Sequence, residues 1–142
     1  MLFKALFAIF SMIIAGADFK TGVVPRLAFV IAFPLFIILK ILSNESLPLW
    51  ELFAGAVLGL GIFLIAFFIS GRKLGLADVW YSALIGLVLG PLWWYLAIGS
   101  ACITGMIFML ASRRRRIPFI PFMALGSIVV SVIQVAGTFS LR

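Results

Sequence analysis

The sequence has no histidine and a single cysteine, Cys102, among its 142 residues. Without histidine it lacks the commonest metal ligand and the commonest general base. A lone cysteine excludes a disulfide within the chain and a cysteine-based metal site. Acidic residues are also scarce, since 4 Asp and Glu stand against 11 Lys and Arg, for a net charge of +7. Any chemistry must therefore come from very few polar groups.

Apolar residues, by contrast, are abundant: 65% of the chain is hydrophobic, and the mean hydropathy is +1.34. A soluble domain is about half apolar, and a small one has too much surface to bury more. Lipid accepts such a chain, but only helices and closed barrels satisfy the backbone there. The apolar runs are long and do not alternate as barrel strands do. They predict an all-α membrane protein.

Six apolar runs predict six transmembrane helices, at residues 2–17, 27–42, 50–70, 75–89, 92–111 and 117–139. A span needs about 20 residues, so the second and fourth runs are short. Gly90 and Pro91 end the fourth, and a re-entrant pair is the alternative to separate fourth and fifth spans. The chain, residues 1–142, is expected to be one transmembrane domain.

The basic residues are concentrated in alternate connections between these runs. The first, third and fifth connections hold Lys20, Arg26, Arg72, Lys73 and Arg113 to Arg116, whereas the other side has Lys4, Lys40 and Arg142. The positive-inside rule then places both termini outside the cytoplasm, in a multi-pass protein of the inner (cytoplasmic) membrane. We interpret the arginine run as a topology anchor that touches anionic lipid, and we expect no nucleic-acid partner.

The first run has an alternative interpretation as a secretory signal. Lys4, an apolar stretch and the small residues 15–17 resemble such a signal and its cleavage site. Lys20 and Arg26 follow at once, and basic residues there hold that end in the cytoplasm. We therefore favour a membrane span.

Two of the four acids stand at membrane depth. Glu45 and Glu51 lie in or beside an outer connection, where solvation explains them, but Asp18 ends the first span and Asp78 begins the fourth. Because these spans run in opposite directions, both aspartates come out at the cytoplasmic end. A carboxylate at this depth is costly and usually has a function or a partner.

Each aspartate extends a stripe of small residues along one helical face, and such stripes let helices approach closely in lipid. We predict that the two stripes face each other and bring the carboxyl groups together. The stripes are Ala8, Ser11, Ala15 and Asp18 in the first span, and Asp78, Ser82, Gly86 and Gly90 in the fourth. A third small-residue face consists of Gly55, Gly59 and Gly61, and we interpret it as a surface for helix packing.

Two carboxyl groups a few ångströms apart cannot both ionise easily, so the pair can supply a base and an acid at once. The base would deprotonate a water, and the acid would protonate a carbonyl oxygen or a leaving nitrogen. The alternative is structural: Asp78 would pair with Arg72 or Lys73, and Asp18 with Lys20.

Three motifs around these residues resemble those of the type IV prepilin and preflagellin peptidases. Residues 18–25 are similar to the first-aspartate motif, in which Pro25 follows Asp18 by seven positions. Residues 75–78 (Gly-Leu-Ala-Asp) resemble the Gly-x-Gly-Asp motif shared with signal-peptide peptidase and presenilin. Residues 117–122 resemble the Pro-Phe-x-Pro segment that opens the last helix. The motifs follow the family order over nearly the whole chain.

The chain departs from the family pattern at Ala77, Arg26 and Trp80, where glycine, asparagine and lysine are usual. It also lacks the Cys-rich insertion of the large bacterial enzymes. The departures leave the aspartates intact and change the residues that would face a substrate. The missing insertion gives no support for zinc or for methyltransferase activity.

The resemblance implies an intramembrane aspartyl endopeptidase that cuts the leader from pilin-like precursors at the cytoplasmic face. Asp18 and Asp78 would be catalytic. Gly75 and Ala77 would leave room for the substrate backbone, and Pro25 would fix the turn that exposes Asp18. No cofactor or metal is expected, and the partners would be the precursor and membrane lipid.

The rival prediction is a non-enzymatic membrane module, either a small transporter or a partner in pilus or secretion assembly. A proton-coupled transporter also uses membrane carboxyls, but it places them near the midplane and often has an internal repeat. Here they lie at one edge, and no repeat is evident.

Overall fold

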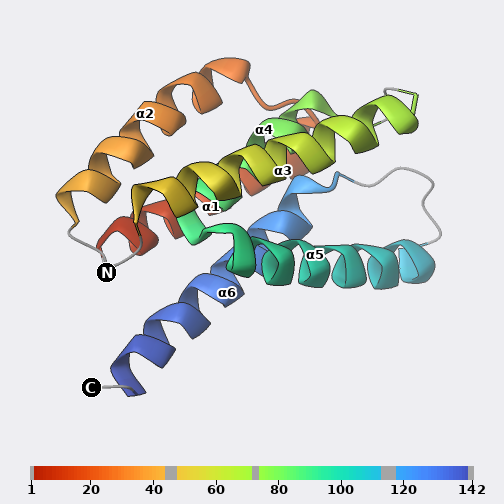
Figure 1. Cartoon of the computed structure of the whole chain (residues 1–142). Coiled ribbons are helices and arrows are strands. Elements are labelled where there is room, and N and C mark those ends of the chain that lie inside the picture. Colours follow the sequence, from red (N-terminus) through yellow and green to blue (C-terminus); the bar gives the residue numbers. More distant parts are fainter. Residues whose placement is uncertain (1, 44–47, 72–73, 113–117, 141–142) are drawn as a thin grey trace.

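The computed structural model describes residues 2–43, 48–71, 74–112 and 118–140. These residues form six helices (Figure 1), which confirms the predicted all-helical fold class. Each helix lies on one of the six apolar runs: α1 (Leu2–Thr21), α2 (Arg26–Leu42), α3 (Leu49–Ile69), α4 (Leu76–Leu89), α5 (Pro91–Ser112) and α6 (Ile120–Ser140). The roles expected for Glu45, Arg72, Lys73, Arg113 to Arg116, Ile117 and Arg142 fall outside the described residues.

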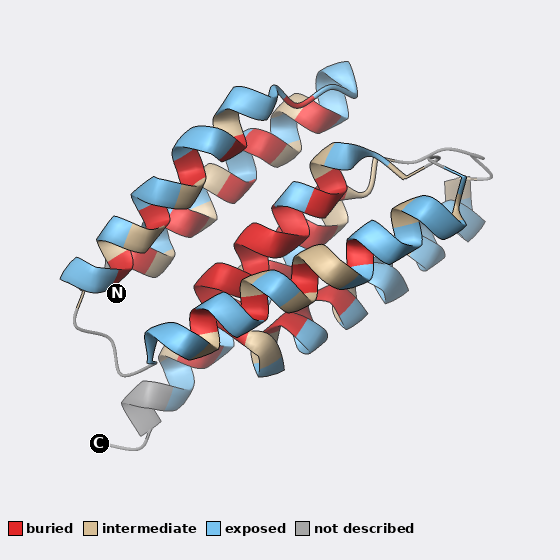
Figure 2. Ribbon diagram, turned by 45° about the horizontal axis from the view of Figure 1, so that its top comes forward, coloured by how far each residue is buried: buried red, intermediate tan, exposed pale blue. Residues whose placement is uncertain are grey.

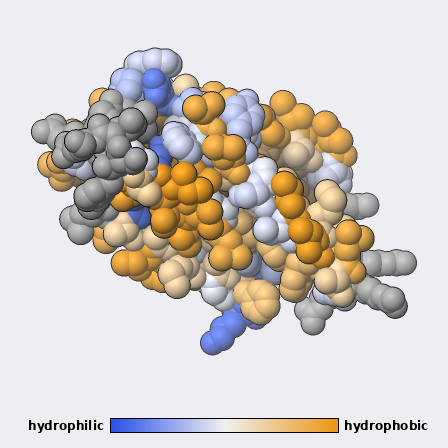
Figure 3. Space-filling model, turned by 90° about the horizontal axis from the view of Figure 1, so that it is seen from below, coloured by the Kyte–Doolittle hydropathy of each residue, from blue (hydrophilic) through white to orange (hydrophobic). Residues whose placement is uncertain are grey.

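Within the described residues, three helices are long and apolar enough to cross a membrane, namely α3, α5 and Ile120–Gly137 of α6. α4 has 14 residues and is about 21 Å long, short of the roughly 30 Å hydrocarbon core of a bilayer. Apolar side chains cover much of the face in Figure 3, as expected for a surface that contacts lipid. These helices indicate a membrane protein; the six-span topology remains a prediction.

The arrangement of helix ends determines which residues can meet. In Figure 1 the first residues of α1 and the last residues of α6 lie at one end of the bundle. The last turn of α1, the first turn of α2 and the first turn of α4 lie towards the other end. Asp18 and Asp78 therefore share one end of the molecule.

α4 is the centre of the bundle. Its side chains from Asp78 to Leu89 are all buried except Trp80 (Figure 2), because α2, α3, α5 and α6 all pack around it. Tyr81, Leu84 and Val88 have no exposed surface. A short helix enclosed in this way is held by its neighbours on every side, which fixes the position of Asp78 in its first turn.

The closest helix contact in the bundle joins α4 to α3. A Cβ atom built on Gly86 would collide with the carbonyl of Gly55, and one built on Gly59 would lie 2.6 Å from the carbonyl oxygen of Ser82. Backbones can approach this closely only where side chains are absent or small. The Ser82 hydroxyl donates to the Gly59 carbonyl at 3.2 Å, and the indole N–H of Trp94 donates to the Ser82 carbonyl at 3.1 Å.

This contact corrects one prediction. We expected Ser82 and Gly86 to face α1, but they face α3, and α1 packs mainly against α6 and α2. The reason is the matching spacing of Gly55 and Gly59, which leaves a groove deep enough for the backbone of α4. α1 meets α4 through side chains, since Ser11 of α1 is fully buried and lies near the Tyr81 hydroxyl of α4.

Candidate active site

Asp18 lies in the last turn of α1, and the end of that helix determines where its side chain stands. Gly22 adopts φ +64°, a left-handed conformation that suits glycine just after a helix. Its N–H donates to the Asp18 carbonyl at 2.8 Å, and the Thr21 hydroxyl donates to the Ala17 carbonyl at 2.7 Å. The helix is thus closed directly beyond Asp18, whose side chain is only 8% exposed.

Asp78 lies in the first turn of α4, and its side chain accepts a hydrogen bond from the backbone of Gly75, the N-cap residue of that helix. The Gly75 N–H donates to Oδ2 of Asp78 at 3.1 Å, and the Asp78 N–H donates to the Gly75 carbonyl at 3.1 Å. A carboxylate is favourable at a helix N-terminus, where free N–H groups point outward. This bond fixes one carboxyl oxygen, and the side chain as a whole is 8% exposed.

The structure brings these two acids together. The Asp18 carboxyl is close enough to that of Asp78 for their charges to interact. In the described part of the chain, Asp18 forms no ion pair with Lys20. The other structural alternative, in which Asp78 pairs with Arg72 or Lys73, lies outside the described residues. Among the described residues, no group of three or more His, Cys, Asp or Glu side chains lies close enough together to hold a metal ion.

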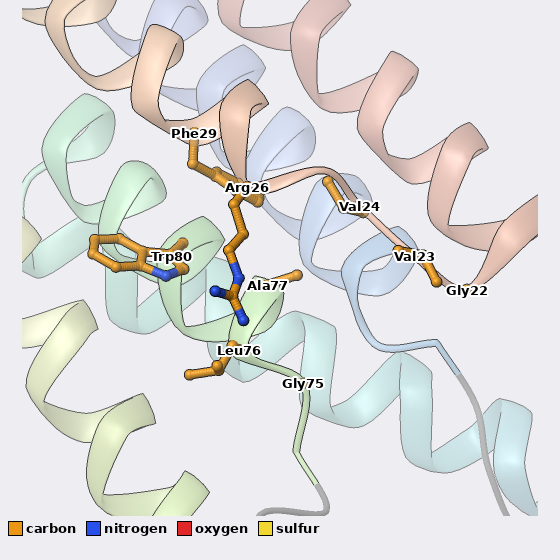
Figure 4. Close-up of a pocket in the computed structure, with 9 residues that line it drawn as sticks. All are labelled: Gly22, Val23, Val24, Arg26, Phe29, Gly75, Leu76, Ala77 and Trp80. Carbon is orange, nitrogen blue, oxygen red and sulfur yellow. The ribbon is translucent and has the colours of Figure 1, made fainter.

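A pocket of about 210 Å³ lies between the segment that follows Asp18 and the segment that precedes Asp78 (Figure 4). Its wall consists of the chain that follows Asp18, the first turns of α2 and the chain that leads to Asp78. The lining residues are Gly22, Val23, Val24, Arg26, Phe29, Gly75, Leu76, Ala77 and Trp80. Of the substrate-binding residues that we predicted, Gly75 and Ala77 line this pocket. Pro25 does not line it; it is exposed and precedes the first residue of α2.

From the sequence, Arg26 and Trp80 were identified as departures from the family pattern among residues that would face a substrate, and Arg26 also as a topology signal. Phe29 and Gly22 to Val24 were assigned no role in a site. All of them line the pocket. The available signal was position: Arg26 follows Pro25, and Trp80 follows Asp78 by two residues. Such a signal places residues near the acids, but it does not say which of them point into a cavity.

A second polar layer lies deeper in the bundle. The hydroxyls of Ser11 in α1 and Ser127 in α6 lie near that of Tyr81 in α4, and all three residues are fully buried. Tyr81 follows Asp78 by about one turn, and Ser11 precedes Asp18 by about two turns, so the layer lies on the same faces as the acids. It places one hydroxyl from each of three helices close together in the interior of the bundle.

The third sequence motif serves packing in this structure. Phe119 lies against Phe63 of α3, with 6.3 Å between ring centroids, and Phe122 lies 5.4 Å from Phe108 of α5. These contacts hold the first turn of α6 against two helices. The described residues of this motif do not line the pocket.

The protein is all-helical, with two buried carboxyl groups at one end of the bundle and an open pocket beside them. The family model described as the type IV leader peptidase family matches residues 5–110. The chain belongs to this family, as its motifs predicted. The match includes Asp18 and Asp78 and ends before residues 117–122. No curated protein and no solved structure matches the chain.

Proposed function

We propose that this protein is an intramembrane aspartyl endopeptidase that removes the leader from a pilin-like precursor at the cytoplasmic face of the cell membrane. Membership of a leader peptidase family supports proteolysis. One observation supports the aspartyl mechanism above all: Asp18 and Asp78 come from distant parts of the chain, are both buried, and lie close enough for the charge of Asp18 to act on Asp78.

The proposed chemistry needs one ionised and one protonated carboxyl. The ionised group removes a proton from a water, whose oxygen attacks the scissile carbonyl carbon, while the protonated group donates its proton to the carbonyl oxygen. The peptide C–N bond then breaks, and a proton passes to the leaving nitrogen. Two neighbouring carboxyls provide this combination because both do not ionise readily together.

The position of the acids argues against the transporter alternative. Asp18 lies in the last turn of α1 and Asp78 in the first turn of α4. A carrier that moves protons across the bilayer would place such groups near the middle of its helices. At a helix end they meet a substrate segment that enters from the membrane surface.

The test is cleavage of a leader-containing peptide by the purified protein, with the products identified by mass. We expect Asp18→Asn and Asp78→Asn each to reduce turnover by at least about 10³-fold, since loss of one member of a catalytic unit has effects of this order. Glu51→Gln is the matched control, because Glu51 is an acid in the first turn of α3, in the half of the bundle away from the pair. It should retain full turnover.

A melting curve for each variant separates loss of chemistry from loss of folding. Full turnover in a folded Asp18→Asn or Asp78→Asn variant would exclude the aspartyl mechanism. Absence of cleavage by the wild-type protein, across a panel of pilin-like leaders, would exclude the proposed function.

A further inference from the structure

Among the described residues that line the pocket, Arg26 has the only charged side chain. Arg26, the first residue of α2, extends across the pocket between Trp80 and the chain at Gly75 (Figure 4). All other lining residues are glycine or apolar. A guanidinium among glycine and apolar side chains gives the pocket a preference for a negatively charged group.

Within the described residues, the guanidinium of Arg26 is not paired with an acceptor. Among the described residues, no ion pair or hydrogen bond involves its guanidinium, although Asp18 and Asp78 belong to adjacent segments. A guanidinium carries five N–H donors in a fixed planar arrangement that matches a carboxylate. The side chain is exposed, so these donors are available to a molecule that enters the pocket.

The pocket lies between the two segments that carry the acids, where the proposed substrate would reach them. Gly22 to Val24 follow Asp18 directly, and Gly75 to Ala77 directly precede Asp78. A group bound in the pocket therefore lies within a few residues of the peptide bond held by the pair. The volume of about 210 Å³ is below the roughly 300–1,000 Å³ of pockets for whole small molecules. It suits one or two side chains of an extended peptide.

Building on the proposed function, we propose that Arg26 is a specificity-determining residue: the pocket accepts an acidic side chain of the precursor, a few residues from the scissile bond, flanked by apolar residues. The carboxylate would accept two N–H bonds from the guanidinium. Phe29, Val24 and Trp80 would contact the apolar neighbours. A basic side chain at this position would be repelled.

The test is a peptide scan against the purified protein in a zwitterionic detergent. A cleavable leader peptide carries glutamine at one position at a time on either side of the cut, and each peptide is paired with its glutamate twin. We expect one position, or two adjacent positions, at which glutamate raises kcat/KM about tenfold, the size of one charge-assisted contact of about 1.4 kcal/mol. Arg26→Gln should remove that preference, and Arg26→Glu should reverse it towards lysine.

Two further variants separate charge at the pocket from general effects. Arg26→Lys keeps the charge without the planar fork, so it should retain part of the preference. Lys20 is an exposed cation at the same end of the bundle, and it does not line the pocket. Lys20→Gln should therefore retain the full glutamate preference.

Three results would overturn the proposal while cleavage itself persists. They are equal cleavage of the glutamine and glutamate twins at every position, a glutamate preference that survives in Arg26→Gln, and an equal loss for all peptides in that variant. A repeat in vesicles with and without anionic lipid tests a lipid phosphate as the ligand of Arg26; an effect that follows the lipid and not the peptide also overturns it. If the wild type cuts none of the peptides, the proposed function itself fails.

Discussion

Gly86 of α4 lies against Gly55 of α3 so closely that a Cβ on either residue would collide with the carbonyl group of the other. This contact holds the most buried helix of the molecule against a helix that is long and apolar enough to span the membrane. The position of α4, and with it the position of Asp78, depends on two residues without side chains.

Gly86→Ala should therefore destabilise the protein by about 1–3 kcal/mol, the usual cost of forcing extra volume into a packed interior. Gly61→Ala is the matched control in α3, because nothing lies within 4 Å of its added Cβ. The control should be neutral or stabilising by up to about 1 kcal/mol, since alanine favours helix over glycine. Unfolding in detergent micelles measures both, and equal melting of the two variants would contradict the packing argument.

The same contact shows what the sequence could and could not predict. The apolar runs located all six helices, because continuous hydrophobic segments bounded by charge or proline are a local property. The small-residue stripes were also recognised, including Gly55 and Gly59. Their pairing was wrong, because a stripe shows that a helix can be approached closely but does not identify the neighbour. That choice depends on how all six helices fill space together.

The candidate site, too, could be predicted from the sequence only in part. Asp18 and Asp78 could be placed at one end of the bundle, because the end of a helix at which a residue lies follows from the number of passes. The pocket could not be predicted, because its shape depends on the direction of Arg26 and on the left-handed turn at Gly22. Neither is encoded in a periodic pattern.

The six-span topology predicts opposite sides for two described positions. In a Cys102→Ser background, a cysteine introduced as Ser43→Cys, after α2, should react with a membrane-impermeant maleimide in intact cells. One introduced as Thr21→Cys, at the end of α1, should react only after the membrane is opened. Labelling of both positions in intact cells would exclude the proposed orientation.

Activity should not depend on a metal ion. The proposed mechanism uses two carboxyls and a water, and the sequence offers no histidine. We therefore expect turnover of a leader peptide to persist after dialysis against EDTA and against 1,10-phenanthroline, within experimental error. A loss that is restored by one divalent ion would show that metal chemistry takes part.

The pair should also determine how activity changes with pH and with double substitution. Turnover requires one proton shared between Asp18 and Asp78, so the rate should fall at low pH, when both carboxyls are protonated, and at high pH, when both are ionised. The resulting bell-shaped curve belongs to the pair and not to either residue.

Because the two groups act as one unit, the double variant Asp18→Asn with Asp78→Asn should be about as inactive as each single variant. A purely structural role predicts the opposite, namely losses in melting temperature without this pH profile. Rates of the wild type from pH 4 to pH 10, measured with the melting temperature at each pH, distinguish the two, and a rate that stays flat while the protein remains folded would contradict acid–base chemistry by these aspartates.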